Sequence, residues 1–223
     1  MTDPTMESTT DPATDSVSHH SADTSADIAA DTGMVANGRG HSASRGRGPH
    51  DLGGLLRARI RDIPDYPQAG IVFKDITPLL ADHVAFAGVV DAVVSHHGRG
   101  TVDKVVGVEA RGFILAAPVA YHFGAGFVPV RKKGKLPAPT FEASYQLEYG
   151  EAVLEVHRDA FAGGDRVLIV DDVLATGGTV AATADLIRQA GGVVVGCSVL
   201  LELAILGART RLTDLDVHAL LQV

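Results

Sequence analysis

The chain is poor in cysteine, in long apolar segments and in positive charge. Cys197 is the single cysteine among 223 residues, which excludes an intrachain disulfide and agrees with a reducing compartment, so we expect a cytoplasmic protein. The longest apolar run, at 193–201, is well short of the ~20 residues that cross a bilayer, so we expect no membrane partner. A formal net charge of −8 argues against a nucleic-acid partner, because general nucleic-acid binders present basic surfaces.

The first 50 residues differ in composition from the rest of the chain. They contain no Phe, Tyr or Trp and almost no large aliphatic residues, and they include a short Arg/Gly-rich stretch at 38–48. Such a segment cannot bury enough apolar surface to offset its loss of conformational entropy. It also lacks the basic start and apolar middle of a signal peptide. We therefore expect a disordered low-complexity extension over residues 1–50 and one domain over residues 51–223.

From about residue 52 onward, apolar strand-like runs alternate with segments of helical spacing. The spacing predicts strands at 104–108, 126–130, 166–170 and 193–201, and helices at 84–95, 112–123 and 179–189. This order is typical of an α/β fold with a largely parallel sheet. The stretch 136–156 interrupts the alternation, with two prolines followed by strand-like residues, and predicts a long hairpin or flap.

One segment combines an apolar strand with two acids and a loop of small residues. Four apolar residues at 167–170 precede Asp171 and Asp172, which we expect at the carboxyl end of the strand, where open α/β sheets bind ligands. Adjacent carboxylates can accept hydrogen bonds from vicinal sugar hydroxyls, and the amides of the following loop can surround a phosphate at the start of the next helix. The loop residues are Ala175, Thr176, Gly177, Gly178 and Thr179. The segment therefore predicts a ribose 5-phosphate site.

Other interpretations of these features are simpler. The loop alone could be a solvated strand-to-helix turn with Thr179 as the N-cap, although this leaves the two acids unexplained. The sequence contains no G-x-x-x-x-G-K-[ST] loop, and the first βα turn lacks G-x-G-x-x-G. No spacing of His, Cys and Asp resembles a zinc site, and we expect His96 and His97 to end a helix, where a cationic ring suits the helix dipole.

The segment at 166–179 resembles the phosphoribosyl pyrophosphate motif of the type I phosphoribosyltransferase family, which consists of four apolar residues, two acids and a Thr-Gly-Gly-Thr-like loop. Further motifs at 67–78, 109–113, 131–137 and 143–150 resemble the adenine-specific members of that family, in the same order and spacing. The resemblance covers about residues 55–223. It implies a type I phosphoribosyltransferase fold, with a mostly parallel central sheet flanked by helices, a flexible flap hairpin and a small hood.

The resemblance implies a pentosyltransferase of purine salvage that joins adenine to phosphoribosyl pyrophosphate and gives AMP and pyrophosphate. It also implies a homodimer and Mg²⁺ as cofactor, held through the pyrophosphate and the ribose hydroxyls. One alternative keeps the sugar-phosphate site but uses hypoxanthine, guanine or xanthine as the base. A second alternative is a regulatory protein that senses phosphoribosyl pyrophosphate and controls transcription. That case would need a nucleic-acid-binding domain, and residues 1–50 show no helix-turn-helix pattern.

Basic residues follow two of the predicted strands. Arg111 should face the same rim as the two acids, where its guanidinium can hold pyrophosphate oxygens; the alternative is a surface ion pair with Glu109. Four cations lie within 131–135, and a pyrophosphate would offset their mutual repulsion, with a solvated basic turn as the alternative. The resemblance favours Arg131, Lys132 and Lys135 as the pyrophosphate contacts.

The resemblance also assigns residues to the chemistry and to the base. It places proton transfer at Glu148, with Tyr149 closing beside the reaction centre, whereas the sequence alone allows Glu148 to be an exposed hairpin residue.

For adenine, the resemblance places Val72 and Lys74 beside the base, with backbone groups that read its Watson–Crick edge, and Phe73 and Leu203 on its two faces. Stacking of an aromatic ring on a purine is physically reasonable, although Phe73 could also belong to the core.

Overall fold

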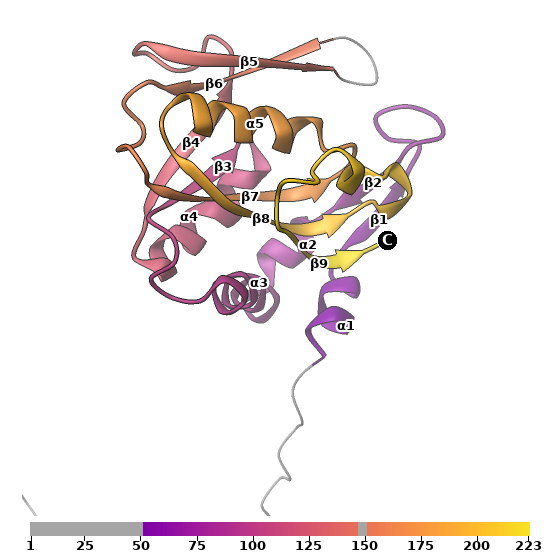
Figure 1. Cartoon of the computed structure of the whole chain (residues 1–223). Helices are drawn as coiled ribbons and strands as arrows, with labels where there is room; N and C mark the ends of the chain where they lie inside the picture. The colour runs from indigo at the N-terminus through magenta and orange to yellow at the C-terminus, as the bar shows by residue number, and fades with distance from the viewer. Residues whose placement is uncertain (1–50, 147–150) are drawn as a thin grey trace, which may run out of the picture. The chain divides into compact units, whose positions relative to one another are not determined.

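The structure is a computed structural model that describes residues 51–146 and 151–223. The extension expected over residues 1–50 lies outside the described residues, as do Glu148 and Tyr149. The described elements are, in chain order, α1 (Leu52–Arg57), β1 (Arg61–Pro64), β2 (Val72–Asp75), α2 (Thr77–Ala81), α3 (His83–His97), β3 (Lys104–Val108), α4 (Arg111–Phe123), β4 (Gly126–Lys132), β5 (Thr140–Gln146), β6 (Glu151–His157), β7 (Arg166–Leu174), α5 (Gly178–Gln189), β8 (Val193–Glu202), the 3₁₀ turns Ala204–Leu206 and Ala208–Thr210, and β9 (Val217–Gln222) (Figure 1).

A seven-stranded sheet in the order β5-β6-β4-β3-β7-β8-β9 forms the centre of the fold. The strands from β4 to β9 in this order run parallel, and β6 pairs antiparallel with both β4 and β5. In β7 the apolar residues at 167–170 are all 2% exposed or less, which explains the unbroken apolar run, because both faces of this strand are covered. The predicted mostly parallel α/β sheet is thus confirmed.

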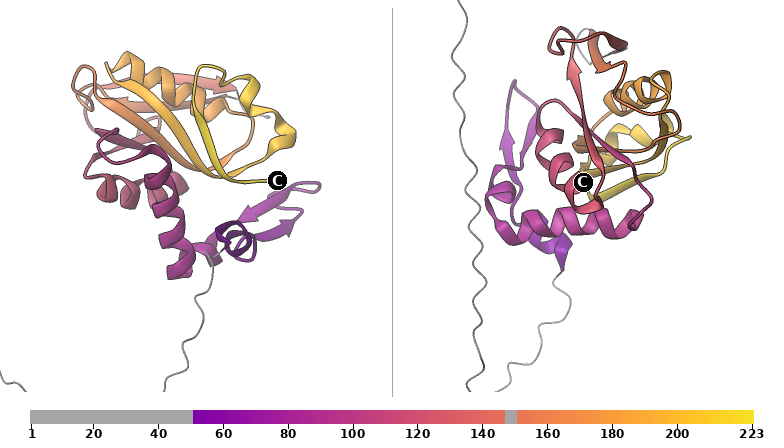
Figure 2. Two further views of the ribbon diagram at one scale, coloured as in Figure 1. Left: turned by 60° about the horizontal axis from the view of Figure 1, so that its bottom comes forward. Right: turned by 90° about the vertical axis from the view of Figure 1, so that its left-hand side faces the viewer.

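Helices cover both faces of the sheet and divide the core into two parts. Figures 1 and 2 show α3 and α4 on one face and α5 on the other, with the β5–β6 hairpin above α5. Val89 of α3 and Leu115 of α4 belong to the first core cluster, and Leu186 and Ile187 of α5 to the second. Burial of each such side chain contributes about 1.5–3 kcal/mol. Within the described residues, no helix is both long enough and apolar enough to span a membrane.

Most elements agree with the sequence-based expectations. The three predicted helices are present with ends that differ by at most two residues, and the stretch 136–156 contains the expected hairpin, β5 paired antiparallel with β6. A separate two-stranded sheet of β1 and β2 forms the expected small hood. Strands β4 and β7 run beyond their predicted ends, to Lys132 and Leu174. Cys197 is fully buried in β8.

The histidines that end α3 differ in part from the expectation. His96 and His97 are its last two residues, as predicted. The expectation of a cationic ring is wrong for His97, whose ring lies against His96 and close to His218. Burial, followed by the neighbouring His96 and His218, lowers the pKa of His97 to about 4. His97 is therefore neutral at physiological pH.

Candidate active site

The acid pair lies toward the carboxyl end of β7, but inside the strand rather than after it. Asp171 still pairs with Val199 of β8, and the strand continues to Leu174. Asp171 is 8% exposed and Asp172 is 6% exposed. The backbone N–H of Asp172 donates a 2.9 Å hydrogen bond to Oδ1 of Asp171. Burial, followed by the neighbouring carboxylate of Asp172, raises the pKa of Asp171.

Arg111, the first residue of α4, is the cation beside the acid pair. Its Nε lies 2.7 Å from Oδ2 of Asp172, and its Cζ lies 5.0 Å from the centre of the Phe73 ring. The predicted alternative, an ion pair between Arg111 and Glu109, is not among the ion pairs of the described residues. Although Arg111 is close, the buried Oδ2 of Asp172 accepts no well-directed hydrogen bond in the described part of the chain. This oxygen is available to a hydroxyl donor.

Gly112 allows α4 to approach the acid pair. A Cβ atom at this position would lie 2.7 Å from Oδ1 of Asp171 and 3.1 Å from the carbonyl oxygen of Val170. Both distances are shorter than ordinary van der Waals contact. We did not predict this residue from the sequence. Its signals were its place within the 109–113 motif and its occurrence in a helix, where glycine is about 1 kcal/mol less favourable than alanine and therefore needs a reason.

The loop after β7 leads into a helix whose start has no side-chain cap. Gly177 is the N-cap of α5 and has φ of 81°, a left-handed conformation that suits glycine. The first amides of α5 are therefore available to an anion, which the helix dipole also favours. The alternative role of Thr179 as N-cap is wrong, because Thr179 lies inside the helix and its carbonyl accepts a hydrogen bond from Thr183. Thr176 is exposed in the loop.

A cavity of about 370 Å³ connects these elements. Its walls come from the ends of β3, β4 and β7 and from the starts of α4 and α5. The predicted site residues that line it are Arg111, Lys132, Asp171, Asp172, Ala175 and Thr179. Tyr145 of β5 lines it as well and was not predicted; it lies within the 143–150 motif, which was the available signal. Residues predicted for the sugar phosphate and residues predicted for the pyrophosphate therefore line the same cavity.

The basic turn after β4 is held by an acid at the end of β3. Glu109 accepts hydrogen bonds from Nε of Arg131 at 3.3 Å, Nζ of Lys135 at 3.0 Å and the backbone N–H of Lys132 at 3.1 Å. Burial would raise the pKa of Glu109, but these hydrogen bonds outweigh it and lower the pKa to about 2. Among the described residues, the Lys132 side chain forms no ion pair. The expected repulsion between these cations is thus offset within the protein.

The residues predicted for the base lie on β2 and after β8. Phe73 is partly buried outside both core clusters, so it is not a core residue. It lines a second cavity, of about 220 Å³, with Tyr66, whose ring meets it edge to face at 5.2 Å. Val72 is exposed, whereas Lys74 is partly buried and its Nζ lies 2.7 Å from Asp62.

Leu203 directly follows β8 near the acid-bearing strand. Its backbone N–H donates a 2.9 Å hydrogen bond to the carbonyl of Leu174, the last residue of β7. Its side chain is partly buried and packs against the first core cluster. The placement of Leu203 and Phe73 on the two faces of a base remains a prediction.

Known proteins share this fold and sequence. Residues 77–216 match the family model for the phosphoribosyl transferase domain. The chain is 67% identical to an adenine phosphoribosyltransferase from Acidothermus cellulolyticus over 175 residues, 78% of this chain and 99% of that protein. Crystal structures of adenine phosphoribosyltransferases from Rhodothermus marinus and, complexed with adenine and an imino-altritol bisphosphate, from Saccharomyces cerevisiae match with TM-scores of 0.74 and 0.72. Their identities are 51% and 35%, over 77% and 76% of this chain and 98% of each relative. The chain belongs to the adenine phosphoribosyltransferases, within the type I phosphoribosyltransferase family.

Proposed function

We propose that this chain joins adenine to phosphoribosyl pyrophosphate in the cavity at the carboxyl ends of β3 and β7, forming AMP and releasing pyrophosphate. The observation that supports this most strongly is the nearly buried acid pair, Asp171 and Asp172, beside both Arg111 and the uncapped start of α5. Hydroxyl-binding, pyrophosphate-binding and phosphate-binding groups then share one cavity of about 370 Å³. Similar proteins that are named adenine phosphoribosyltransferase favour adenine over the other purines as the base, and favour an enzyme over a regulatory protein.

The sugar phosphate binds to the strand-loop-helix unit of β7 and α5. Asp171 and Asp172 accept hydrogen bonds from the two ribose hydroxyls, and the Oδ2 of Asp172 that lacks a hydrogen bond is one such acceptor. The amides at 175–179, with the hydroxyls of Thr176 and Thr179, surround the 5-phosphate at the helix start. Asp172 also keeps Arg111 near the anomeric carbon, since their ion pair spans 2.7 Å.

The pyrophosphate group binds to the basic residues on the other side of the cavity. Arg111 and Lys132 already line the cavity, so they contact the pyrophosphate first. Arg131 and Lys135 hold hydrogen bonds to Glu109, which they exchange in part for pyrophosphate oxygens. Each charge-assisted hydrogen bond of this kind contributes about 1.5–3 kcal/mol. The net gain for Arg131 and Lys135 is smaller, because each gives up a hydrogen bond to Glu109.

The donor set also fits Mg²⁺. This ion prefers oxygen ligands and is usually held jointly with substrate phosphates. Asp171 and Asp172 would hold the ribose hydroxyls, and the ion would be held by those hydroxyls and by the pyrophosphate. Oδ2 of Asp172, which accepts no hydrogen bond within the described residues, suits this arrangement. When bound, Mg²⁺ shares the negative charge of the pyrophosphate and improves it as a leaving group.

In the transfer itself, the bond from the anomeric carbon to pyrophosphate breaks and the bond to N9 of adenine forms. We assign the proton that the base gives up to Glu148, and the closing of the site against water to Tyr149. Both lie outside the described residues. Their sequence position supports the assignment, because Tyr145 lines the cavity and three extended residues reach about 10 Å.

We place adenine between Phe73 and Leu203. Cζ of Arg111 lies over the face of the Phe73 ring, 5.0 Å from the ring centre, so a base stacked on this ring lies close to the reaction centre. Because the hood has two strands, alternate residues of β2 direct their N–H and C=O groups away from β1, toward a ligand. Backbone groups of Val72 and Lys74 can therefore read the Watson–Crick edge, while the Lys74 side chain stays with Asp62.

We further propose a cytoplasmic homodimer whose protomer folds over residues 51–223. The single buried thiol agrees with the compartment. Ile114 and Tyr121 of α4 are 44% and 84% exposed, lie seven residues apart on one side of that helix, and offer an apolar surface for the second protomer.

A base-competition assay tests the function. The purified chain, given phosphoribosyl pyrophosphate and Mg²⁺, should convert adenine to AMP much faster than it converts hypoxanthine to IMP. Equal rates would contradict the choice of base. The double variant Asp171→Asn/Asp172→Asn should lose heat of binding for phosphoribosyl pyrophosphate in calorimetry, and retention of both binding and turnover would remove the acid pair from the site.

A further inference from the structure

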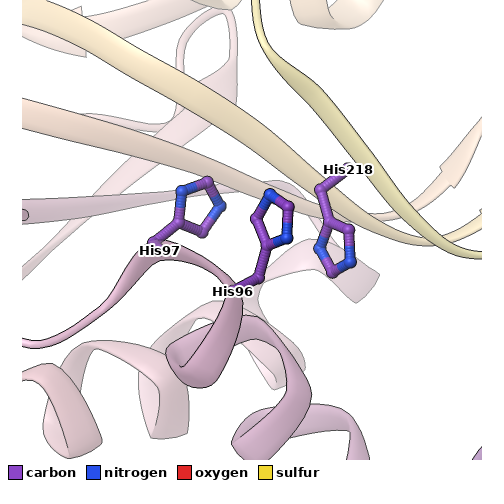
Figure 3. Close-up of side chains that lie close together, drawn as sticks. All are labelled: His96, His97 and His218. Atoms are coloured by element: carbon purple, nitrogen blue, oxygen red, sulfur yellow. The ribbon is translucent and has the colours of Figure 1, made fainter.

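Three histidines from distant parts of the chain meet beside the edge strand β9. Figure 3 shows His96 and His97 at the end of α3 and His218 on β9, with their rings turned toward one another. One potential ligand atom of each ring lies within 4.8 Å of the other two. His218 pairs with Ser198 of β8, which in turn pairs with Val170 of β7, so the cluster lies on a strand two positions across the sheet from the strand that carries the acid pair. None of the three lines the active-site cavity.

A buried serine joins two of these rings. Oγ of Ser198 on β8 lies 2.8 Å from Nε2 of His97 and 3.4 Å from Nδ1 of His218. Ser198 is fully buried, so its position is fixed by the packing of the sheet. The Ser198 hydroxyl is thus a hydrogen-bond partner of both rings and holds them close together. The third ring, His96, stacks on His218 with 3.7 Å between ring centres and 3° between planes.

The protonation state of the cluster suits a cation ligand set. A histidine binds a metal ion through an unprotonated nitrogen. Burial, followed by the charge of His96, lowers the pKa values of both His97 and His218. Asp216 acts in the opposite direction on both rings and adds a negative charge near the cluster. At neutral pH these two rings are therefore uncharged, and each has one unprotonated nitrogen.

We propose that His96, His97 and His218 form a binding site for a divalent transition-metal ion, which we assign as Zn²⁺. Imidazole nitrogens suit this class of ion, whereas Mg²⁺ prefers oxygen ligands. The exposed side of His96 leaves a fourth position to water. The site is independent of the transfer reaction, and its effect is to connect the end of α3 to the C-terminal strand.

Binding requires a small rearrangement that the location allows. With Zn–N bonds of about 2.0–2.1 Å in a tetrahedral arrangement, ligand nitrogens lie about 3.3 Å apart, closer than the present limit of 4.8 Å. A metal ion lies in the plane of each imidazole that binds it, so two stacked rings cannot share one ion. His96 must therefore rotate away from His218. It is exposed and ends its helix, so this rotation disturbs no core packing.

Zinc binding and thermal unfolding of the full chain test the site. The chain is freed of metal by a chelator and titrated with ZnCl₂ in a calorimeter, as wild type and as the variants His96→Ala, His218→Gln and His122→Ala. His122 is exposed at the end of α4, so its variant is the matched control for loss of a surface histidine. The control also accounts for Zn²⁺ bound elsewhere, since the chain has 10 histidines.

We expect His96→Ala and His218→Gln each to weaken one Zn²⁺ site by at least about tenfold, because one of three ligands is lost. His122→Ala should bind as the wild type does. Zn²⁺ at 100 times its Kd should raise the melting temperature of wild type and control by about 5–10 °C, and less in His96→Ala. His96→Ala should keep the adenine-transfer activity with Mg²⁺, which separates this outcome from a misfolded variant. Equal Zn²⁺ affinity and equal thermal shift in His96→Ala and His122→Ala would overturn the proposal.

Discussion

Replacement of Gly112 by alanine should damage the active site without unfolding the protein. The new Cβ would lie 2.7 Å from Oδ1 of Asp171, about 0.7 Å closer than the 3.4 Å at which ordinary contact begins. Asp171 can move aside only by breaking its 2.9 Å hydrogen bond from the Asp172 amide. If α4 moves instead, Arg111 is drawn away from Asp172, 2.7 Å from its Nε. Either movement displaces a group that we assign to the binding of phosphoribosyl pyrophosphate.

The magnitude follows from that displacement. A misplacement of about 1 Å in a positioned group lowers the rate by about 10²-fold, so we expect kcat/KM for phosphoribosyl pyrophosphate to fall by that factor. Overpacking costs about 1–3 kcal/mol, which lowers the melting temperature of a domain of this size by about 2–12 °C. The protein should therefore remain folded at 25 °C.

Steady-state kinetics with varied phosphoribosyl pyrophosphate and a thermal melt measure both effects. Gly88→Ala is the matched control, because its Cβ would also lie 2.7 Å from a neighbour, but that neighbour is the flexible end of Leu52, away from the cavity. The control should keep wild-type kinetics. Wild-type kcat and KM in Gly112→Ala would refute the claim that the approach of α4 positions the acid pair.

Glu148→Gln should lower kcat by about 10²–10⁴-fold with little change in the Kd of phosphoribosyl pyrophosphate, as expected for a general acid–base; unchanged turnover in a stopped assay would exclude it. A chain that begins at Asp51 should keep the melting temperature and kcat of the full chain, because α1 begins at Leu52 and packs into the first core cluster; loss of either would show that the preceding residues are needed. Asp171→Asn should raise the free energy of unfolding at about pH 8 but not at about pH 3 in urea titrations. The raised pKa of Asp171 means that the wild type loses stability as pH rises through that pKa, while below the unfolded value near 3.8 the carboxyl is protonated in both states. An equal gain at both pH values would contradict this origin.

The central part of the fold could be predicted because its signals are local. The apolar residues at 167–170 indicated a strand buried on both faces, and the helical spacing indicated α3, α4 and α5. The end of β7 could not be predicted in this way. Acids seldom lie inside a buried strand, and the pairing with β8 and the cation of Arg111 that keep Asp171 and Asp172 there are tertiary effects. The short elements β1, α2 and β9 carry too little pattern to be distinguished from loops.

In the candidate site, too, the features with local signals could be predicted and those that depend on tertiary contacts could not. The strand, the acids and the small-residue loop indicated a phosphate site, and the structure brings six of the predicted residues to one cavity. Gly112 and Tyr145 could not be predicted individually, because their importance depends on what lies opposite them in space. The neutral state of His97 was missed for the same reason, since the burial that lowers its pKa, and the nearness of His218, arise only on folding. Glu148 and Tyr149 stay predictions.

The hydrogen bonds of Glu109 to the basic turn have a consequence for the release of product. Because this carboxylate already partners Arg131 and Lys135, pyrophosphate at the site that we propose would replace hydrogen bonds to Glu109, and its net gain would be only the difference in binding free energy between the two anions. When the diphosphate leaves, the glutamate takes its place and no bare cluster of cations is exposed. An internal competitor of this kind would limit inhibition by the product and would keep the basic turn of the unliganded protein in shape for the next substrate.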